Sequence, residues 1–219
     1  MAKELNSRAQ VTRIDGQNCF VEVLTEALPI DKVAINFCSY DKSAETGGRM
    51  KDHITFYLPV LDAYALALDI MSDRMTRLHQ KSMKEAEAAG SKYPKPVKSY
   101  IGGTPAKKAN RADGKALSRS FTISPGSKYP WVLCAECGPG EQEEGKIIVP
   151  AYGYGKEVAK PEMLVRVPMT QENFEVFAVA IITCWETWRQ RFVGLVLPVF
   201  DKQNEEWQKS VEKRRSDAA

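Results

Sequence analysis

The stretch HITFYLPV at residues 53–60 and the stretch EMLVRVPM at residues 162–169 share one pattern. In each, apolar and polar side chains alternate as in a half-buried strand, and a proline closes the run. Sequence with helical spacing of apolar residues follows each proline. The first series is Leu61, Ala65, Leu68, Met71 and Met75, and the second is Phe174, Phe177, Ile181, Trp185 and Trp188. Three further strand-like runs precede each stretch, so the sequence predicts two copies of a unit with four strands and a helix.

The predicted strands of the first copy are residues 11–14, 19–25, 32–40 and 53–58, and those of the second are 119–124, 131–136, 146–152 and 163–167. Equivalent positions are offset by 110 residues between Val11 and Phe121 and by 109 between Pro59 and Pro168. We therefore expect an α+β fold in which two pseudo-repeated β-β-β-β-α units form one antiparallel-sheet domain with their helices packed together.

The predicted organisation has five parts. Residues 1–10 form a flexible tail, 11–89 the first unit and 118–197 the second, and 198–219 a charged C-terminal helix or tail. Residues 90–117 are rich in Gly, Pro, Lys, Ser and Ala and have few bulky apolar groups, so they are predicted as a basic, mobile linker or loop. The apolar helix face that includes Trp185 and Trp188 is expected to pack on the first helix or on another subunit.

The charge of the chain is concentrated in its centre. Residues 74–119 contain twelve bases and three acids, a net +9, so the remainder of the chain carries −6 of the total of +3. The first residues, MAKELNS, have no apolar core, and the longest apolar run is too short to cross a bilayer. We therefore expect a cytoplasmic protein without a signal peptide or a membrane span.

Five cysteines without regular spacing argue against a disulfide framework. Cys134 and Cys137 have the spacing of half a zinc site, but a structural zinc needs four ligands and no second Cys-x-x-Cys follows. Both lie on one predicted strand, on opposite faces. Half-buried thiols are the interpretation we favour, and these two residues stay the metal candidates. The two histidines have no nucleophile or carboxylate at a recognisable spacing, so the sequence predicts neither an enzyme nor a cofactor.

The stretch KVAINFCSYDK at residues 32–42 and the strand-to-helix passage at 54–70 resemble the Whirly family and the positive-cofactor type of transcriptional coactivator. The resemblance covers about residues 11–75 and 119–190. The plant Whirly signature Lys-Gly-Lys-Ala-Ala-Leu has no counterpart, so the similarity is to a bacterial or phage branch. It implies a sequence-independent single-stranded DNA- or RNA-binding protein that acts in replication or recombination, with a phage or mobile-element origin among the options.

Binding a single strand requires cations beside phosphates and aromatic faces on which bases stack. The predicted outer strand faces and the turns beside them offer both residue types. The candidate nucleic-acid-binding residues are Lys32, Asn36, Tyr40, Lys42, Arg49, Lys51, His53, Tyr57, Lys128, Tyr129, Trp131, Lys146, Tyr152, Tyr154, Lys156 and Arg166.

Two other functions remain open. Tyrosine and lysine are common on strand surfaces for reasons of propensity and solubility, so the same faces fit a protein–protein interaction or phage assembly module. A nuclease is the third possibility. Steep salt dependence of binding separates the first function from the second, since a single-strand binder loses affinity as salt rises.

Overall fold

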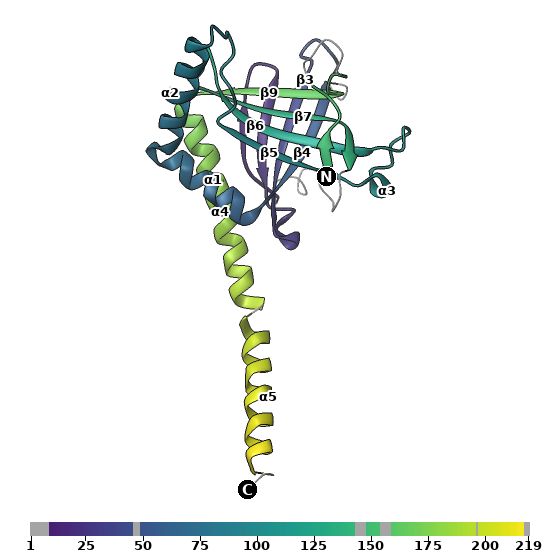
Figure 1. Ribbon diagram of the computed structural model, residues 1–219, viewed down its shortest axis with the longest axis vertical. Helices are drawn as coiled ribbons and strands as arrows, with labels where there is room; N and C mark the ends of the chain where they lie inside the picture. Colours follow the sequence, from purple (N-terminus) through teal and green to yellow (C-terminus); the bar gives the residue numbers. More distant parts are fainter. Residues whose placement is uncertain (1–8, 46–48, 143–147, 154–158, 196, 217–219) are drawn as a thin grey trace.

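The fold of the computed structural model consists of two antiparallel sheets and their helices, and residues 9–45, 49–142, 148–153, 159–195 and 197–216 are described (Figure 1). Sheet A contains β1 (Gln10–Asp15), β2 (Cys19–Leu24), β3 (Lys32–Tyr40) and β4 (Met50–Pro59), paired in sequence order. Sheet B has the order β5 (Lys98–Thr104), β6 (Ala116–Pro125) and β7 (Trp131–Gln142). The other edge of β7 pairs with β8 (Ile148–Pro150) and β9 (Met163–Met169). The α+β class predicted from the sequence is confirmed.

The repeat of four strands and a helix is present, with a different first strand in the second copy. Strands β1 to β4 lead into α1 (Val60–Met71), and β5, β6, β7 and β9 lead into α4 (Gln171–Leu195). The alignment of Val11 with Phe121 was therefore wrong, because it matched β1 with β6. Each copy forms its own antiparallel sheet within the predicted α+β architecture.

The segment predicted as a mobile linker, residues 90–117, contains β5 and the short helix α3 (Ala106–Ala109). Alternation is hard to recognise in KSYIGGT because Gly102 and Gly103 have no side chains. The glycine at 103 is required by close packing, since a Cβ there would lie 2.4 Å from the carbonyl oxygen of Leu117. Two of the segment's bases are held by ion pairs, Lys98 with Asp69 and Arg111 with Asp113 and Glu162.

The two sheets pack through their apolar faces, and their strands run across each other (Figure 1). The ring of Phe121 on β6 lies 5.4 Å from that of Phe37 on β3 and 5.8 Å from that of Phe56 on β4, measured between centroids. All three side chains are buried. Because the inner faces meet, the outer faces of sheets A and B point in opposite directions.

The long helix predicted after Pro59 is divided at Ser72 into α1 and α2 (Asp73–Ala88). Ser72 has extended backbone angles, and its hydroxyl accepts a hydrogen bond from the backbone N–H of Arg74, so it acts as the N-cap of α2. The rings of Tyr64 on α1 and Trp185 on α4 stack at 4.1 Å. The predicted packing of the second helix on the first is confirmed.

The apolar series with helical spacing that begins at Leu61 is not the face that α1 buries. Leu61 is 64% exposed, Leu68 and Met71 are exposed too, and the helix instead buries Val60, Ala63, Leu66, Ala67 and Ile70. Both sets have helical spacing because apolar residues surround most of this helix, so periodicity alone does not select a face.

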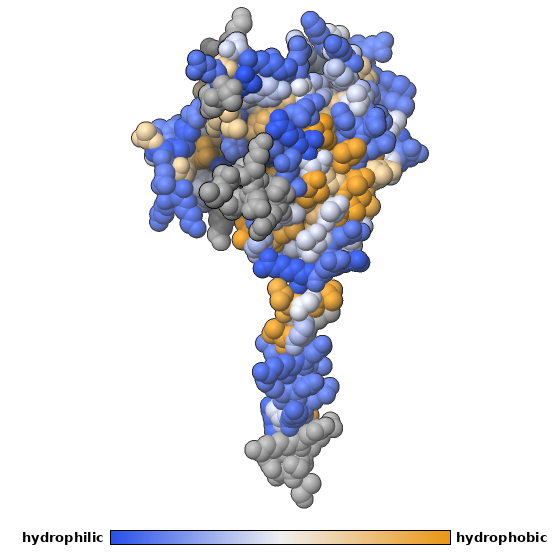
Figure 2. Space-filling model, turned by 180° about the vertical axis from the view of Figure 1, so that it is seen from behind, coloured by the Kyte–Doolittle hydropathy of each residue, from blue (hydrophilic) through white to orange (hydrophobic). Residues whose placement is uncertain are grey.

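The chain ends in α5 (Leu197–Ser216), which extends away from the body of the molecule (Figure 1). Apolar side chains gather at the neck where α4 leads into it (Figure 2). Those exposed there are Phe192, Val193, Leu195, Val199 and Phe200. None of the helices in the described ranges has the length and apolar character needed to cross a membrane.

Candidate nucleic-acid interface

The outer face of sheet A carries predicted residues of the first unit. On β3, Val33, Ile35 and Phe37 point into the core, so the alternate residues Lys32, Asn36 and Tyr40 belong to the opposite face. The register pairs Cys38 with His53 and Ala34 with Tyr57, which places His53 and Tyr57 on this face as well. The hydroxyl of Thr55 donates a hydrogen bond to the Asn36 side chain in the middle of the face.

A cluster of rings and cations lies at one end of this face. The guanidinium carbon of Arg13 is 3.6 Å from the ring centroid of Phe20, and the rings of Phe20 and Tyr40 are 6.1 Å apart. The ammonium group of Lys42 lies 5.9 Å from the Tyr40 ring. We name these four residues the ring–cation cluster. It places two π-surfaces between two positive charges, which is the combination that stacks bases and contacts phosphates.

Arg13 and Phe20 were not among the residues predicted from the sequence. Alternation in residues 19–25 did place Phe20 and Glu22 on one face, but a buried phenylalanine on an outer face is unexpected. Phe20 is covered because Arg13 lies over it. The Arg13 side chain remains 40% exposed, so its planar group is accessible above the ring.

The outer face is less cationic than predicted. Asp15 accepts hydrogen bonds from Arg13, and Glu22 is the register partner of Arg13 on β2. Asp15 also raises the pKa of the Arg13 guanidinium, chiefly through this hydrogen bond. Two carboxylates therefore stand among the cations. Lys51 and Arg49 are exposed near the same end, where the Arg49 guanidinium donates to the carbonyl of Ala44.

Lys32 and Tyr57 lie at the other end of the face. Tyr57 is 41% exposed, and both residues line a pocket at the edge where β4 approaches β5. The first unit's candidates thus form two groups on one surface, separated by Asn36 and Thr55.

The described residues of the second unit form no equivalent aromatic face, and Trp131 was assigned wrongly. Trp131 is 2% exposed, stacks on Phe174 at 4.6 Å and donates from its indole nitrogen to the side-chain oxygen of Gln171 at 2.8 Å. Residues with odd numbers on β7 face the core, as Leu133 and Ala135 do. The sequence could not show which face of this strand is inner, because Val132 and Leu133 are both apolar.

Tyr152 is also an incorrect assignment as an exposed stacking residue. It is 8% exposed and lies against Gly138, where an added Cβ would approach the tyrosine ring to 2.9 Å. Burial raises the pKa of its hydroxyl. Lys146, Tyr154 and Lys156 lie outside the described residues.

The remaining candidates of the second unit lie apart from the ring–cation cluster. Lys128 and Tyr129 form an exposed pair in the turn between β6 and β7, with 5.7 Å between the ammonium group and the ring centroid. Arg166 is exposed on the outer face of sheet B, opposite Cys134 in the register. Since the two outer faces point in opposite directions, the sixteen predicted residues do not form one surface.

All five cysteines are free thiols and buried. Cys134 and Cys137 lie on opposite faces of β7, as predicted, since their register partners are Arg166 and Met163. Burial raises the pKa of Cys134 to about 11, with a smaller contribution from Glu136. Across the described ranges, His, Cys, Asp and Glu side chains form no group of three that could hold a metal ion.

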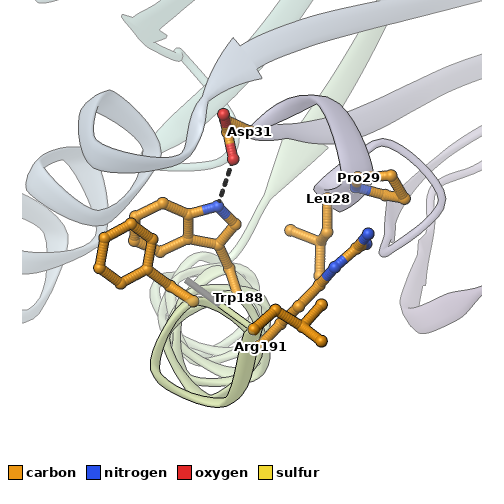
Figure 3. A pocket seen from close by; sticks show the side chains of 7 residues that line it. Leu28, Pro29, Asp31, Trp188 and Arg191 are labelled. Atoms are coloured by element: carbon orange, nitrogen blue, oxygen red, sulfur yellow. Dashed lines mark hydrogen bonds between the residues drawn. The ribbon is translucent and has the colours of Figure 1, made fainter. Parts of the chain in front are cut away.

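An apolar pocket of about 200 Å³ lies between the end of α4 and the short helix η1 (Leu28–Ile30). Figure 3 shows the indole nitrogen of Trp188 donating to the Asp31 carboxylate, at 2.7 Å, beside Leu28, Pro29 and Arg191. The contact joins the first unit to the helix of the second. We assign it to the stability of the fold.

Comparison with known proteins identifies a solved structure that is similar to this chain. No protein-family model matches the chain, and a search of curated proteins finds no match. Among solved structures, the crystal structure of WHY1 from Arabidopsis thaliana, a Whirly protein, is similar with a TM-score of 0.42 and 10% sequence identity. The match covers 86% of this chain and 90% of that chain. At this identity and score, what the chain binds has to be inferred from its own side chains.

Proposed function

We propose that this protein binds single-stranded nucleic acid, DNA in the first instance, through the outer face of sheet A and without choice of sequence. The observation that carries the proposal is the ring–cation cluster, in which Arg13 covers Phe20 and Lys42 lies beside Tyr40. An aromatic face stacks on any base, and a cation beside it contacts the neighbouring phosphate. The asparagine and threonine in the middle of the face add hydrogen-bonding groups without a fixed base preference.

The biological setting belongs to the same proposal. A protein of this kind would cover single strands during replication or recombination, in the cytoplasm, for a phage, a mobile element or a bacterial host. The sequence resemblance of residues 32–42 to single-strand binders supports this setting. We propose no catalytic activity. Hydrolysis of labelled DNA with Mg²⁺ or Mn²⁺ tests that statement, and turnover lost with one carboxylate substitution would overturn it.

The proposal is tested by fluorescence anisotropy with labelled oligo-dT and a matched duplex over a series of salt concentrations. We expect the single strand to bind at least tenfold more tightly than the duplex. The logarithm of its binding constant should fall linearly with the logarithm of the salt concentration. Equal affinity for the two, or no binding at low salt, would refute the proposal. Binding to a protein partner with an affinity that does not change with salt would instead favour the alternative function, a protein–protein interaction module.

We also propose that the protein self-associates through exposed apolar helix surfaces. Leu61, Leu68 and Met71 on α1, together with Phe192 and Leu195 at the neck of α5, are exposed although large and apolar. Exposed apolar patches of this kind mark interaction sites in soluble proteins. Light scattering after size-exclusion chromatography would show a mass above that of one chain, and a strict monomer at high concentration would exclude self-association.

A further inference from the structure

A pocket at the junction of the two sheets has the composition of an anion site. The Phe56 side chain of edge strand β4 in sheet A reaches edge strand β5 in sheet B, since a Cβ on Gly102 would be 3.7 Å from its ring. The space between them measures about 130 Å³. Its lining residues are Lys32, Phe56, Tyr57, Gly102, Gly103, Thr104 and Arg119.

The charge of this lining is +2, from Lys32 and Arg119, and none of the seven residues is acidic. The Arg119 guanidinium is partly buried and donates to the Thr104 hydroxyl at 3.0 Å. Within the described part of the chain, neither Arg119 nor Lys32 forms an ion pair. By contrast, Arg111, eight positions earlier, is held by two carboxylates.

The Arg119 guanidinium has five N–H donors, and the Thr104 hydroxyl is the one neutral acceptor bonded to it, so most of its donors still need a partner. Its charge also needs a partner, because an unpaired charge that is partly buried is costly in free energy. A bound anion would satisfy both requirements. Phosphate suits the site because its oxygens accept from a guanidinium in a bidentate way and from an ammonium at the same time. Tyr57, exposed at the rim, offers a ring face for the base attached to that phosphate.

We propose that this pocket binds one phosphate group of a nucleotide between Lys32 and Arg119, with its base on Tyr57. The inference deepens the proposed function and rests on it for the identity of the ligand as a nucleic acid. The site would hold the strand at one fixed point at the sheet junction, whereas the ring–cation cluster contacts it at the far end of the same face. None of Gly102, Gly103, Thr104 and Arg119 was among the residues predicted from the sequence.

Three dinucleotides distinguish the two possible sources of the phosphate. TpT has only an internal phosphodiester, pTpT adds a 5′-phosphate and TpTp a 3′-phosphate. Titrations of the full chain, followed by backbone amide NMR, should perturb Gly102, Gly103 and Thr104. Equal affinity for the three indicates an internal phosphate, and tighter binding of a phosphorylated form indicates a strand end. Either result supports the pocket, whereas perturbations that spare these three residues contradict it.

The variants Arg119→Gln and Lys32→Gln should each weaken the tightest dinucleotide at least fivefold. Lys84→Gln removes the same charge from an exposed position on α2 and is the matched control. If Arg119→Gln proves unstable, Lys32→Gln is sufficient for the test, since the Lys32 side chain forms no ion pair within the described residues. Equal affinities for Lys32→Gln and Lys84→Gln would overturn the pocket.

Failure of the proposed function gives a different result. Tyr40 lies outside the pocket, so Tyr40→Ala should weaken the binding of oligo-dT and leave the binding of the dinucleotides unchanged. A protein that binds only the end-phosphorylated dinucleotides in the pocket, and no oligo-dT without an end phosphate, would refute single-strand binding and retain the phosphate site. A protein that binds oligo-dT with unchanged affinity in Lys32→Gln would retain single-strand binding and refute the site.

Discussion

The central carbon of the Arg13 guanidinium lies over Phe20, 3.6 Å from the ring centroid, and the same group donates two hydrogen bonds to Asp15 Oδ1. The two residues come from adjacent strands, and the carboxylate fixes the fork of the arginine. The phenylalanine therefore supports a planar, charged group whose other side is open to solvent. Lysine cannot reproduce this arrangement because its ammonium group is not planar.

Substitution of Arg13 by lysine should consequently weaken single-strand binding although the charge is retained. We expect oligo-dT to bind about threefold to tenfold more weakly to Arg13→Lys, in line with the loss of one stacking surface of about 1 kcal/mol. Fluorescence anisotropy at one fixed salt concentration measures the change. Lys84→Arg is the reverse exchange at an exposed position on α2 and should have no effect. Unchanged binding by Arg13→Lys would show that the charge alone matters.

Removal of the tyrosine in the same cluster should have a larger effect. Tyr40→Ala takes away an aromatic face, and one stacked base is worth about 1–3 kcal/mol. Tyr93→Ala deletes an exposed ring beside a lysine, in the segment after α2, and serves as the control. The slope of affinity against salt should be unchanged for Tyr40→Ala because no cation is lost. Equal losses in the two variants would argue against a localised interface.

Trp131 provides a test in which stability and binding should separate. Its side chain is buried against Phe174 and bonded to Gln171, so Trp131→Ala is expected to lower the free energy of unfolding by about 3–5 kcal/mol. Chemical denaturation measures this loss. At a temperature where the variant is still folded, its affinity for oligo-dT should equal that of the parent. If the folded variant no longer bound oligo-dT, Trp131 would have to be counted among the nucleic-acid-binding residues.

The contrast between Tyr40 and Trp131 shows what the sequence could and could not predict. In β3 the polar and apolar residues alternate, so Val33, Ile35 and Phe37 identify the inner face and Tyr40 follows on the outer one. In β7 the neighbours of Trp131 are apolar or small on both faces. The face of that strand is decided by packing on α4, which no local pattern in the sequence reveals.

Local sequence patterns also limited which strands could be recognised. The β-β-β-β-α order could be recognised twice, because each last strand and its helix have strong periodicity. Strand β5 could not, since Gly102 and Gly103 interrupt the pattern at the position where β6 and β4 come close. The pocket at the sheet junction is lined by this unrecognised strand together with Lys32 and Arg119. The pocket could not be predicted from the sequence, because it forms only where the two sheets meet.

The five thiols should react slowly in the folded protein. Burial raises the pKa of Cys38 and Cys134 to about 11 and that of Cys184 to about 12, and it raises the pKa of Cys19 and Cys137 as well. The thiolate is the reactive form, so little of it is present at pH 8. A colorimetric thiol reagent should modify five groups only after unfolding. Rapid reaction of Cys134 and Cys137 in the native protein, or zinc release when they react, would indicate a metal or redox site.

The ion pairs of Arg111 should make the free energy of unfolding depend on pH in the acidic range. The Arg111 guanidinium donates hydrogen bonds to Asp113 and to Glu162. The bonds to Glu162 join the loop before β6 to the residue before β9. These bonds lower the pKa of Asp113 to about 2 and also lower that of Glu162. A carboxyl group with a lowered pKa in the folded state binds its proton more readily when unfolded. Its contribution is therefore complete above the ordinary carboxyl pKa and is lost as the pH falls towards about 2.

Arg111→Gln removes the partner of both carboxylates, so the variant should melt at a lower temperature than the parent at pH 7. The difference should shrink as the pH is lowered from about 4.5 to 2, since protonation breaks the same bonds in the parent. It should also shrink at high salt, because the carboxylates are solvent-exposed and their attraction is screened. Thermal unfolding curves of both proteins over this range measure it. A difference that stays constant with pH would mean that Arg111 stabilises the loop through packing of its side chain and not through the charges of Asp113 and Glu162.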